Sequence, residues 1–178
     1  GSGKTTLLKL LIREFINLEG DIRIGGHSIA DYALASLRAA IGYVPQDHFL
    51  FSATVGENIA FATPNASQRE IERAAYLANI HEDILGFTNG YGTIVGERGV
   101  SLSGGQKQRL SIARALIMDP EILILDDSLS AVDAKTEEII LQNLKQERSS
   151  KTTIITAHRL SAVQHAEHII VMDEGTII

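Results

Sequence analysis

Apolar residues along this chain form short continuous runs, separated by stretches with helical spacing. Ile41–Val44, residues 122–125 and Thr152–Thr156 are runs rich in Ile, Leu, Val and Thr, a composition typical of strands that are buried on both faces. Segment 4–14 instead places leucine and isoleucine at positions 7, 8, 11 and 12, the spacing of one helix face. The alternation of such strands with helices predicts an α/β fold with a mostly parallel sheet.

The same reading predicts the remaining elements. Ser67 followed by Glu70 is a capping-box signature, which indicates that a helix begins at Gln68. We expect strands over 21–24 and 169–172, and helices over 33–40, 68–79, 82–85, 135–147 and 160–165. Residues 47–118 contain no strong buried-strand run. We therefore expect a mostly helical subdomain at 47–118, inserted into a core formed by residues 1–46 and 119–178.

Length and composition limit the classes of protein that fit. The 178 residues, 44% of them hydrophobic, suffice for one domain with a subdomain. A net charge of −6 argues against a general nucleic-acid binder, because such proteins present a basic face to the phosphate backbone. The absence of cysteine excludes disulfides and thiolate metal sites, and it fits a reducing compartment. No apolar run reaches the roughly 18 residues that a membrane helix needs.

Candidate chemistry gathers where the predicted strands end. Asp126 and Asp127 directly follow the run 122–125, and two adjacent carboxylates at a strand tip suit a nucleoside-triphosphate site. One carboxylate can hold Mg²⁺ while the next addresses the attacking water. Gln46 and His158 also fall just past strand ends. Because ligands bind at the carboxyl ends of parallel strands, these residues are expected to share one site.

The first six residues, GSGKTT, match the end of a phosphate-binding loop of pattern G-x-x-x-x-G-K-[ST]. Gly3, Lys4 and Thr5 occupy its last three fixed positions. In this pattern the lysine reaches the β- and γ-phosphates, and the hydroxyl binds Mg²⁺. The first three positions of the loop would precede residue 1. We therefore expect a P-loop NTPase (RecA-like) fold that is truncated at the N-terminus, in a fragment of a longer protein cut at both ends.

Six motifs together resemble one family closely. They are the loop remnant GSGKTT, a glutamine after a strand (Gln46), the signature LSGGQ at 102–106, the strand ILILDD, the loop SAVD at 130–133 (the D-loop) and the switch histidine His158. In this order they resemble the nucleotide-binding domains of ATP-binding-cassette (ABC) transporters. Segments 50–61 and 95–99 resemble the exporter type, whose membrane helices lie N-terminal on the same chain.

The resemblance implies a role for each motif. The residues that would bind ATP through the phosphate loop are Gly1, Ser2, Gly3, Lys4, Thr5 and Thr6. Those that would contact nucleotide through the signature and the D-loop are Ser103, Gly104, Gly105, Gln106 and Asp133. Mg²⁺ would be bound by Thr5, Gln46 and Asp126, and the catalytic residues would be Gln46, Asp127 and His158. In the family the signature contacts ATP held by a second nucleotide-binding domain, so dimerisation is implied.

One position departs from the family pattern. The residue after the Mg²⁺-binding aspartate is normally a glutamate that acts as the catalytic base, whereas here it is Asp127. The shorter carboxylate would lie roughly 1 to 1.5 Å from the usual place, and an error of about 1 Å can lower a rate on the order of 100-fold. Alternatively, a bridging water or a shifted backbone lets Asp127 work. Our preferred hypothesis is the degenerate half of a bacterial heterodimeric multidrug exporter, with a slow site of its own and a signature that completes a different subunit's fast site.

The implied function is ATP-driven export of small molecules, such as drugs or lipid-like compounds, by a protein at the cytoplasmic face of the cell membrane. Glu97 and Arg98 would sense the loops of the membrane helices, or would form only a surface ion pair. Three alternatives remain: a homodimeric exporter, a soluble ABC ATPase acting on DNA or ribosomes, and a regulatory module that holds ATP without turnover. The acidic charge and the exporter-like segments argue against the soluble class.

Overall fold

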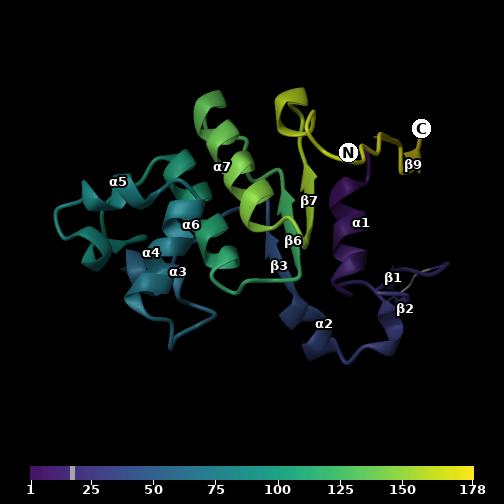
Figure 1. Ribbon diagram of the computed structural model, residues 1–178, viewed down its shortest axis with the longest axis horizontal. Coiled ribbons are helices and arrows are strands. Elements are labelled where there is room, and N and C mark those ends of the chain that lie inside the picture. The colour runs from purple at the N-terminus through teal and green to yellow at the C-terminus, as the bar shows by residue number, and fades with distance from the viewer. Residues whose placement is uncertain (17–18) are drawn as a thin grey trace.

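Three parallel strands form the centre of the molecule in the computed structural model, which describes residues 1–16 and 19–178 (Figure 1). In their order across the sheet they are β3 (Ile41–Val44), β6 (Ile122–Asp126) and β7 (Thr152–Thr156). The register pairs Val44 with Leu125, and Asp126 with Thr156. The carboxyl ends of the three strands therefore lie at one edge of the sheet, and the predicted α/β fold with a parallel sheet is confirmed.

Helices cover both faces of this sheet, because its central strand carries apolar side chains on both sides. The covering helices are α1 (Lys4–Leu11), α6 (Gly104–Leu116) and α7 (Ala134–Glu147). Ile124 packs with Leu8 of α1, whereas Leu123 and Leu125 belong to the larger core that α6 and α7 share. Figure 1 shows α1 and α7 on opposite sides of the strands. Each fully buried side chain of this kind contributes about 1.5 to 3 kcal/mol.

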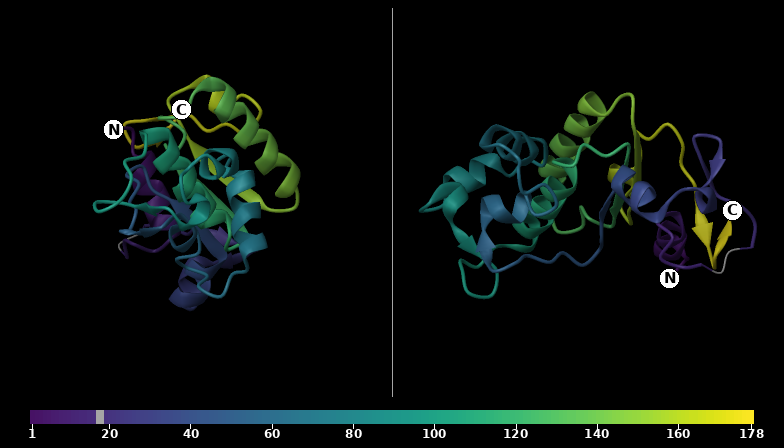
Figure 2. Two further views of the ribbon diagram at one scale, coloured as in Figure 1. Left: turned by 90° about the vertical axis from the view of Figure 1, so that its left-hand side faces the viewer. Right: turned by 90° about the horizontal axis from the view of Figure 1, so that it is seen from below.

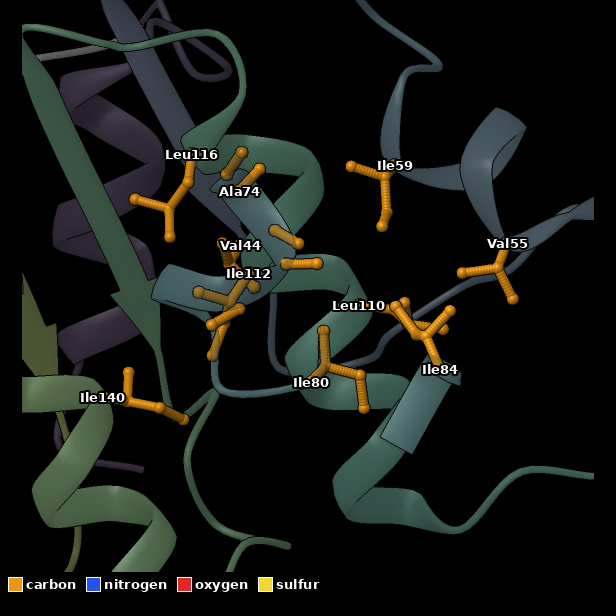
Figure 3. Packing of buried hydrophobic residues seen from close by; sticks show 14 of the residues in the cluster. Val44, Val55, Ile59, Ala74, Ile80, Ile84, Leu110, Ile112, Leu116 and Ile140 are labelled. Carbon is orange, nitrogen blue, oxygen red and sulfur yellow. The ribbon is translucent and has the colours of Figure 1, made fainter. Parts of the chain in front are cut away.

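Four helices pack beside the sheet and extend this larger core. They are α3 (Val55–Ile59), α4 (Gln68–Leu77), α5 (His81–Leu85) and α6, which lie to one side of the strands in the right-hand view of Figure 2. Ile80, Ile84 and Leu110 meet there (Figure 3) and have at most 1% of their surface exposed. The capping box of Ser67 and Glu70 is present at the start of α4, as predicted.

The remaining elements are short. The strands β1 (Arg23–Ile24) and β2 (His27–Ser28) form one antiparallel pair, and β4 (Ala53–Thr54) and β5 (Ile94–Val95) form another. Between the named strands and helices lie η1 (Ile29–Asp31), α2 (Leu34–Ala40) and η2 (Gly90–Gly92). The strand predicted over 21–24 is thus confined to two residues outside the parallel sheet. No helix in the described part of the chain has the length and apolar character required to cross a membrane.

Two expectations for the last part of the chain are wrong. The helix predicted over 160–165 is a single 3-10 turn, η3 (Leu160–Ala162). Six residues form too few i to i−4 hydrogen bonds to offset the cost of helix nucleation, and Ala162 is the one residue of this segment that is fully buried. Tertiary packing therefore does not supply what the short segment lacks.

The strand predicted over 169–172 does not join the parallel sheet. Only β8 (Met172–Asp173) forms, and it pairs antiparallel with β9 (Thr176–Ile177). A strand needs a neighbouring backbone along its length, but among the described residues the run 169–171 receives one backbone hydrogen bond, from Ile178 N to Val171 O. Its three side chains are each more than half exposed.

Candidate functional site

The first residues of the chain form a turn that leads into α1. Gly3 precedes the helix with a φ of 95°, a left-handed conformation that glycine adopts without strain. The Lys4 ammonium donates to Ser2 Oγ at 3.0 Å. The first amides of a helix lack partners within the helix and carry partial positive charge, so together with Lys4 they favour an anion such as phosphate. The residues predicted to bind phosphate, 1–6, therefore lie together at this helix start.

Asp126 lies at the end of β6 and is only 2% exposed. Its Oδ1 accepts hydrogen bonds from the hydroxyls of Thr5 at 3.2 Å and Thr156 at 2.8 Å, and its Oδ2 accepts one from Tyr43 at 2.9 Å. Burial, together with the hydrogen bond to Asp126, raises the pKa of Tyr43 above its ordinary value, so the tyrosine remains a donor. Thr5 and Asp126 place a hydroxyl and a carboxylate side by side, the hard oxygen ligands that Mg²⁺ prefers.

Asp127 has a left-handed backbone conformation, with a φ of 50°. Its amide donates to both the carbonyl and the hydroxyl of Thr156, each at 3.1 Å. These bonds hold the residue in a region that costs an ordinary residue about 1 kcal/mol. Its Oδ2 accepts from Gln46 Nε2 at 3.3 Å and lies 3.9 Å from His158 Nε2. The three residues predicted to be catalytic therefore meet at one carboxylate.

Asp127 and His158 line a small pocket of about 110 Å³ at the carboxyl ends of β6 and β7. This volume is enough to hold water beside the two side chains. The Asp127 side chain is 16% exposed, whereas that of His158 is 75% exposed. The arrangement suits a carboxylate that addresses a water and an imidazole that meets a ligand arriving from solvent.

Ser103 and Gln106 of the signature cap the start of α6. Ser103 Oγ accepts from the Gln106 amide at 3.1 Å, and Gln106 Oε1 accepts from the Ser103 amide at 3.0 Å. Ser103 and Gly104 are exposed. In the part of the chain that the structure describes, no signature side chain hydrogen-bonds to the phosphate loop or to the two strand-end aspartates. Ser103 and Gly104 therefore face solvent, separate from the cluster around Asp126.

An ion pair fixes the start of the signature helix against α5. Arg109 donates from Nη1 and Nη2 to the two carboxylate oxygens of Asp83, each at 3.1 Å, and Gln106 Nε2 lies 3.3 Å from Asp83 Oδ2. Burial alone would raise the pKa of Asp83, but the hydrogen bonds from Arg109 and Gln106 and the charge of Arg109 hold this pKa below its ordinary value. Sequence reasoning missed both Arg109 and Asp83.

Asp133 caps α7 instead of standing free. Its oxygens accept from the Thr136 amide at 2.8 Å and from the Thr136 hydroxyl at 3.1 Å. These bonds lower the pKa of Asp133, which keeps the carboxylate ionised at the positive end of the helix. The structure thus gives the residue a local role, and its predicted contact with nucleotide stays a prediction.

Sequence reasoning also missed the residues that orient the aspartates and the D-loop. Thr156 and Tyr43 donate to Asp126. Gln108, 2% exposed, donates from Nε2 to Ser130 Oγ at 2.9 Å and accepts from the Ala131 amide at 2.8 Å. A signal was available for Thr156, because aligned parallel strands place it opposite Asp126. Gln108 reads as an ordinary helix residue, so its role became visible only with the fold.

Glu97 and Arg98 lie on an exposed turn after β5. Two glycines shape this turn, since a Cβ on Gly96 would meet Phe51 O at 2.8 Å and one on Gly99 would meet Ile94 O at 2.2 Å. Within residues 1–16 and 19–178 neither Glu97 nor Arg98 forms an ion pair. Their side chains are therefore available to a partner, and the predicted role of sensing membrane loops stays a prediction.

Comparison with known sequences decides the family. Residues 1–130 match the family described as ABC transporter. The chain belongs to this ABC transporter family. Among its relatives, the multidrug resistance-like ATP-binding protein MdlA of Escherichia coli is 57% identical over 99% of this chain and 30% of that protein. The probable multidrug resistance ABC transporter ATP-binding/permease protein YheI of Bacillus subtilis is 55% identical over the same shares.

A solved structure supports the same assignment for the fold. The structure of a bacterial Atm1-family ABC exporter with ATP bound superposes with a TM-score of 0.95 at 46% identity, covering 99% of this chain and 31% of that chain. The α/β fold is thus that of the corresponding part of an ABC exporter. This chain spans less than a third of the length of these relatives.

Proposed function

We propose that this ABC chain binds and hydrolyses ATP and thereby powers the export of small molecules across a membrane. The observation that carries the proposal is the 3.2 Å contact between Thr5 Oγ1 and Asp126 Oδ1 at the start of α1. It joins the phosphate loop to the strand end where Asp127, Gln46 and His158 meet. Phosphate-binding amides, hard oxygen ligands and a candidate base are thus adjacent, which is what ATP hydrolysis requires.

Each of these residues has a defined part in the proposed reaction. Residues 1–6 bind the phosphates, and Lys4 supplies a point charge. Mg²⁺, for which Thr5, Asp126 and Gln46 are the candidate ligands, neutralises phosphate charge when bound. Asp127 accepts a proton from the attacking water, and His158 orients the γ-phosphate and that water.

A second nucleotide-binding domain completes the site in this proposal. The exposed Ser103 and the first amides of α6 would clasp the γ-phosphate of ATP held by that domain, since helix starts favour anions. ATP at the shared interface would draw the two domains together. The motion would pass to membrane helices on the same full-length chain, placing the domain at the cytoplasmic face of the membrane.

The names of the relatives support an exporter over a soluble ATPase. One is described as an ATP-binding/permease protein, and this chain matches 30% of its length, which leaves room for a permease part. Both relatives named above are described as multidrug resistance proteins or as similar to them. We therefore propose drugs or lipid-like compounds as the transported class.

Asp127 supports unequal sites in a heterodimer. The base position holds the shorter acid, whereas the signature LSGGQ is intact. In this proposal the chain's own site is slow, and its signature completes the fast site of a different subunit. A homodimer with two equal slow sites is the second candidate, and co-purification of a glutamate-bearing subunit with the tagged full-length protein distinguishes the two.

Transport in liposomes tests the function. The full-length protein, with its partner if one co-purifies, is reconstituted and assayed for ATP turnover and for ATP-dependent accumulation of a fluorescent drug. Lys4→Ala is expected to remove ATP binding at this chain's site, because it deletes the phosphate-binding charge. Lys145→Ala, near the end of α7, is the matched control and should leave both activities intact. ATP turnover without any membrane-dependent transport would contradict the exporter assignment.

A further inference from the structure

Arg159, which directly follows His158 in the chain, contacts two other segments. Its guanidinium donates to the carbonyls of Leu129 at 2.5 Å and Val132 at 3.3 Å. It also forms an ion pair with Glu137 of α7, with 2.5 Å between Arg159 Nη2 and Glu137 Oε2. One side chain therefore connects the segment of the switch histidine with the D-loop, with the residue just before the D-loop, and with α7.

Glu137 holds Arg159 in this position. The Glu137 side chain is 2% exposed, and a carboxylate at that depth must be paired. Its Oε1 accepts from the Ser161 hydroxyl at 2.7 Å. Its Oε2 has no hydrogen-bond partner among the described residues, and the Arg159 charge lies beside it. Arg159 is therefore the charge partner that this buried acid requires.

The D-loop is held from its other side by the signature helix. Gln108 of α6 bonds to both Ser130 and Ala131 at 2.9 and 2.8 Å. The Ser130 hydroxyl in turn donates to the carbonyl of Asp127 at 3.2 Å. The D-loop thus lies between the helix that carries the signature and the segment that carries His158, with hydrogen bonds on both sides.

His158 has little packing of its own. Its side chain is 75% exposed, and the polar contact that the described residues provide is with Asp127 at 3.9 Å. The position of the imidazole therefore depends on the backbone of its own segment, which is the backbone that Arg159 fixes.

We propose that Arg159 is a positioning residue that makes His158, the D-loop and, through Gln108, the signature helix move as one unit. The inference rests on the proposed ATPase function. It adds a physical connection inside one chain between the group that acts on its own ATP and the signature that would act on a partner's ATP. In this proposal Arg159 contacts neither the ATP bound by its own chain nor the ATP bound by the partner.

Arg159→Lys in the full-length protein tests the proposal. Lysine keeps a charge for Glu137 but is a single point donor that cannot bond to both carbonyls as the guanidinium does. The kcat for ATP of the assembled transporter is expected to fall about tenfold, because a shift of the order of 1 Å at the reacting groups is costly. The KM for ATP and the equilibrium affinity for Mg²⁺-ATP should stay unchanged, since the phosphate loop is untouched.

Arg148→Lys is the matched control. Arg148 is 5% exposed and donates to the carbonyls of Pro120 and Thr152 at 2.7 and 2.9 Å. It therefore makes the same kind of bonds, but at the amino ends of β6 and β7, away from the site. Arg148→Lys should lower the Tm about as much as Arg159→Lys does, but it should leave kcat unchanged.

A double-mutant cycle adds a readout that lost stability does not move. Gln108→Glu still accepts from the Ala131 amide but no longer donates to Ser130. If Gln108 and Arg159 act through the same D-loop, their effects on log kcat are non-additive, as for residues that share a network. If Arg159→Lys does not fold, Glu137→Gln removes the charge that fixes Arg159 and should reproduce the loss of kcat.

The outcomes separate the inference from the function on which it rests. No ATP turnover by the wild-type transporter would refute the proposed function itself. Normal wild-type turnover with equal kcat values for Arg159→Lys and Arg148→Lys would overturn the positioning role alone. Additive effects in the cycle would also overturn it, because the two residues would then act separately.

Discussion

The hydroxyl of Thr156 lies 2.8 Å from Asp126 Oδ1 and donates to it. The same hydroxyl accepts from the amide of Asp127 at 3.1 Å. The parallel register of β6 and β7 produces this geometry, because it places Thr156 directly opposite Asp126. A single strand residue therefore contacts both aspartates of the candidate site, at the carboxylate of Asp126 and at the backbone amide of Asp127.

Thr156→Val should damage the site while keeping the strand. Valine is β-branched and fits the strand, but it leaves Asp126 without one donor and the Asp127 amide without one acceptor. We expect the free energy of unfolding to fall by about 1 to 3 kcal/mol, and the Mg²⁺ concentration needed for half-maximal ATP hydrolysis to rise several-fold. Thr156→Ser should restore both. Thr152→Val, at the exposed start of β7, is the control, and an unchanged Mg²⁺ dependence in Thr156→Val would show that the hydroxyl does not orient Asp126.

The sequence predicts the parallel strands well, because a strand that is buried on both faces must be a nearly continuous run of apolar residues. Ile41–Val44 and Thr152–Thr156 match the predicted bounds residue by residue. Once the strands are known, their carboxyl ends must lie at one edge, so the meeting of Gln46, Asp127 and His158 also follows.

The pattern fails where an outcome depends on neighbours distant in sequence. Residues 169–171 are as apolar as the true strands, yet they are exposed, because no strand in the described part of the chain lies along them. Gln108 and Tyr43 carry no local signal, since their partners Ser130 and Asp126 are 22 and 83 residues away. Register and packing, rather than local propensity, decide these contacts.

Gly105→Ala should destabilise the domain although Gly105 lies in a helix. A Cβ at this position would lie 2.9 Å from the carbonyl oxygen of Ala131, and overpacking against backbone costs typically 1 to 3 kcal/mol. The gain in helix propensity is at most about 1 kcal/mol. We expect a lower Tm and a displaced D-loop, with reduced ATP turnover. Gly92→Ala, where a Cβ meets no atom within 4 Å, is the control, and equal Tm values for the two variants would contradict the close approach.

The stabilisation that Asp83 gives to the signature helix should be lost at acidic pH. The folded state depresses the pKa of Asp83 below its ordinary 3.8, so its contribution is fully present above that pH and is lost as the pH falls through the folded pKa. Asp83→Asn should therefore lower the Tm at neutral pH, and the difference from wild type should shrink below about pH 4. Glu82→Gln is the control, because Glu82 is exposed and next in sequence. A Tm difference for Asp83→Asn that is constant from pH 7 to pH 3 would rule out the ion pair as its cause.

Asp127→Glu should raise hydrolysis at this chain's own site. Asp127 accepts from Gln46 at 3.3 Å and lies 3.9 Å from His158, so the surrounding groups are in place and the missing methylene is the difference from the family pattern. Restoring roughly 1 to 1.5 Å of reach is expected to increase turnover on the order of 10- to 100-fold. The measurement is ATP hydrolysis by the proposed heterodimer, in which the catalytic acid of the other subunit is replaced by the amide so that only this site is observed.

A second measurement, made with an intact partner subunit, compares how strongly two variants of this chain reduce ATP turnover. With both subunits otherwise wild type, Ser103→Ala should reduce total turnover more than Asp127→Ala, because the exposed signature serves the fast site in the proposed heterodimer. Asp119→Glu, an exposed acid next to the opposite end of β6, controls for the added methylene. No gain from Asp127→Glu would mean that aspartate already reaches the water, and a larger loss from Asp127→Ala than from Ser103→Ala would overturn the assignment of slow and fast sites.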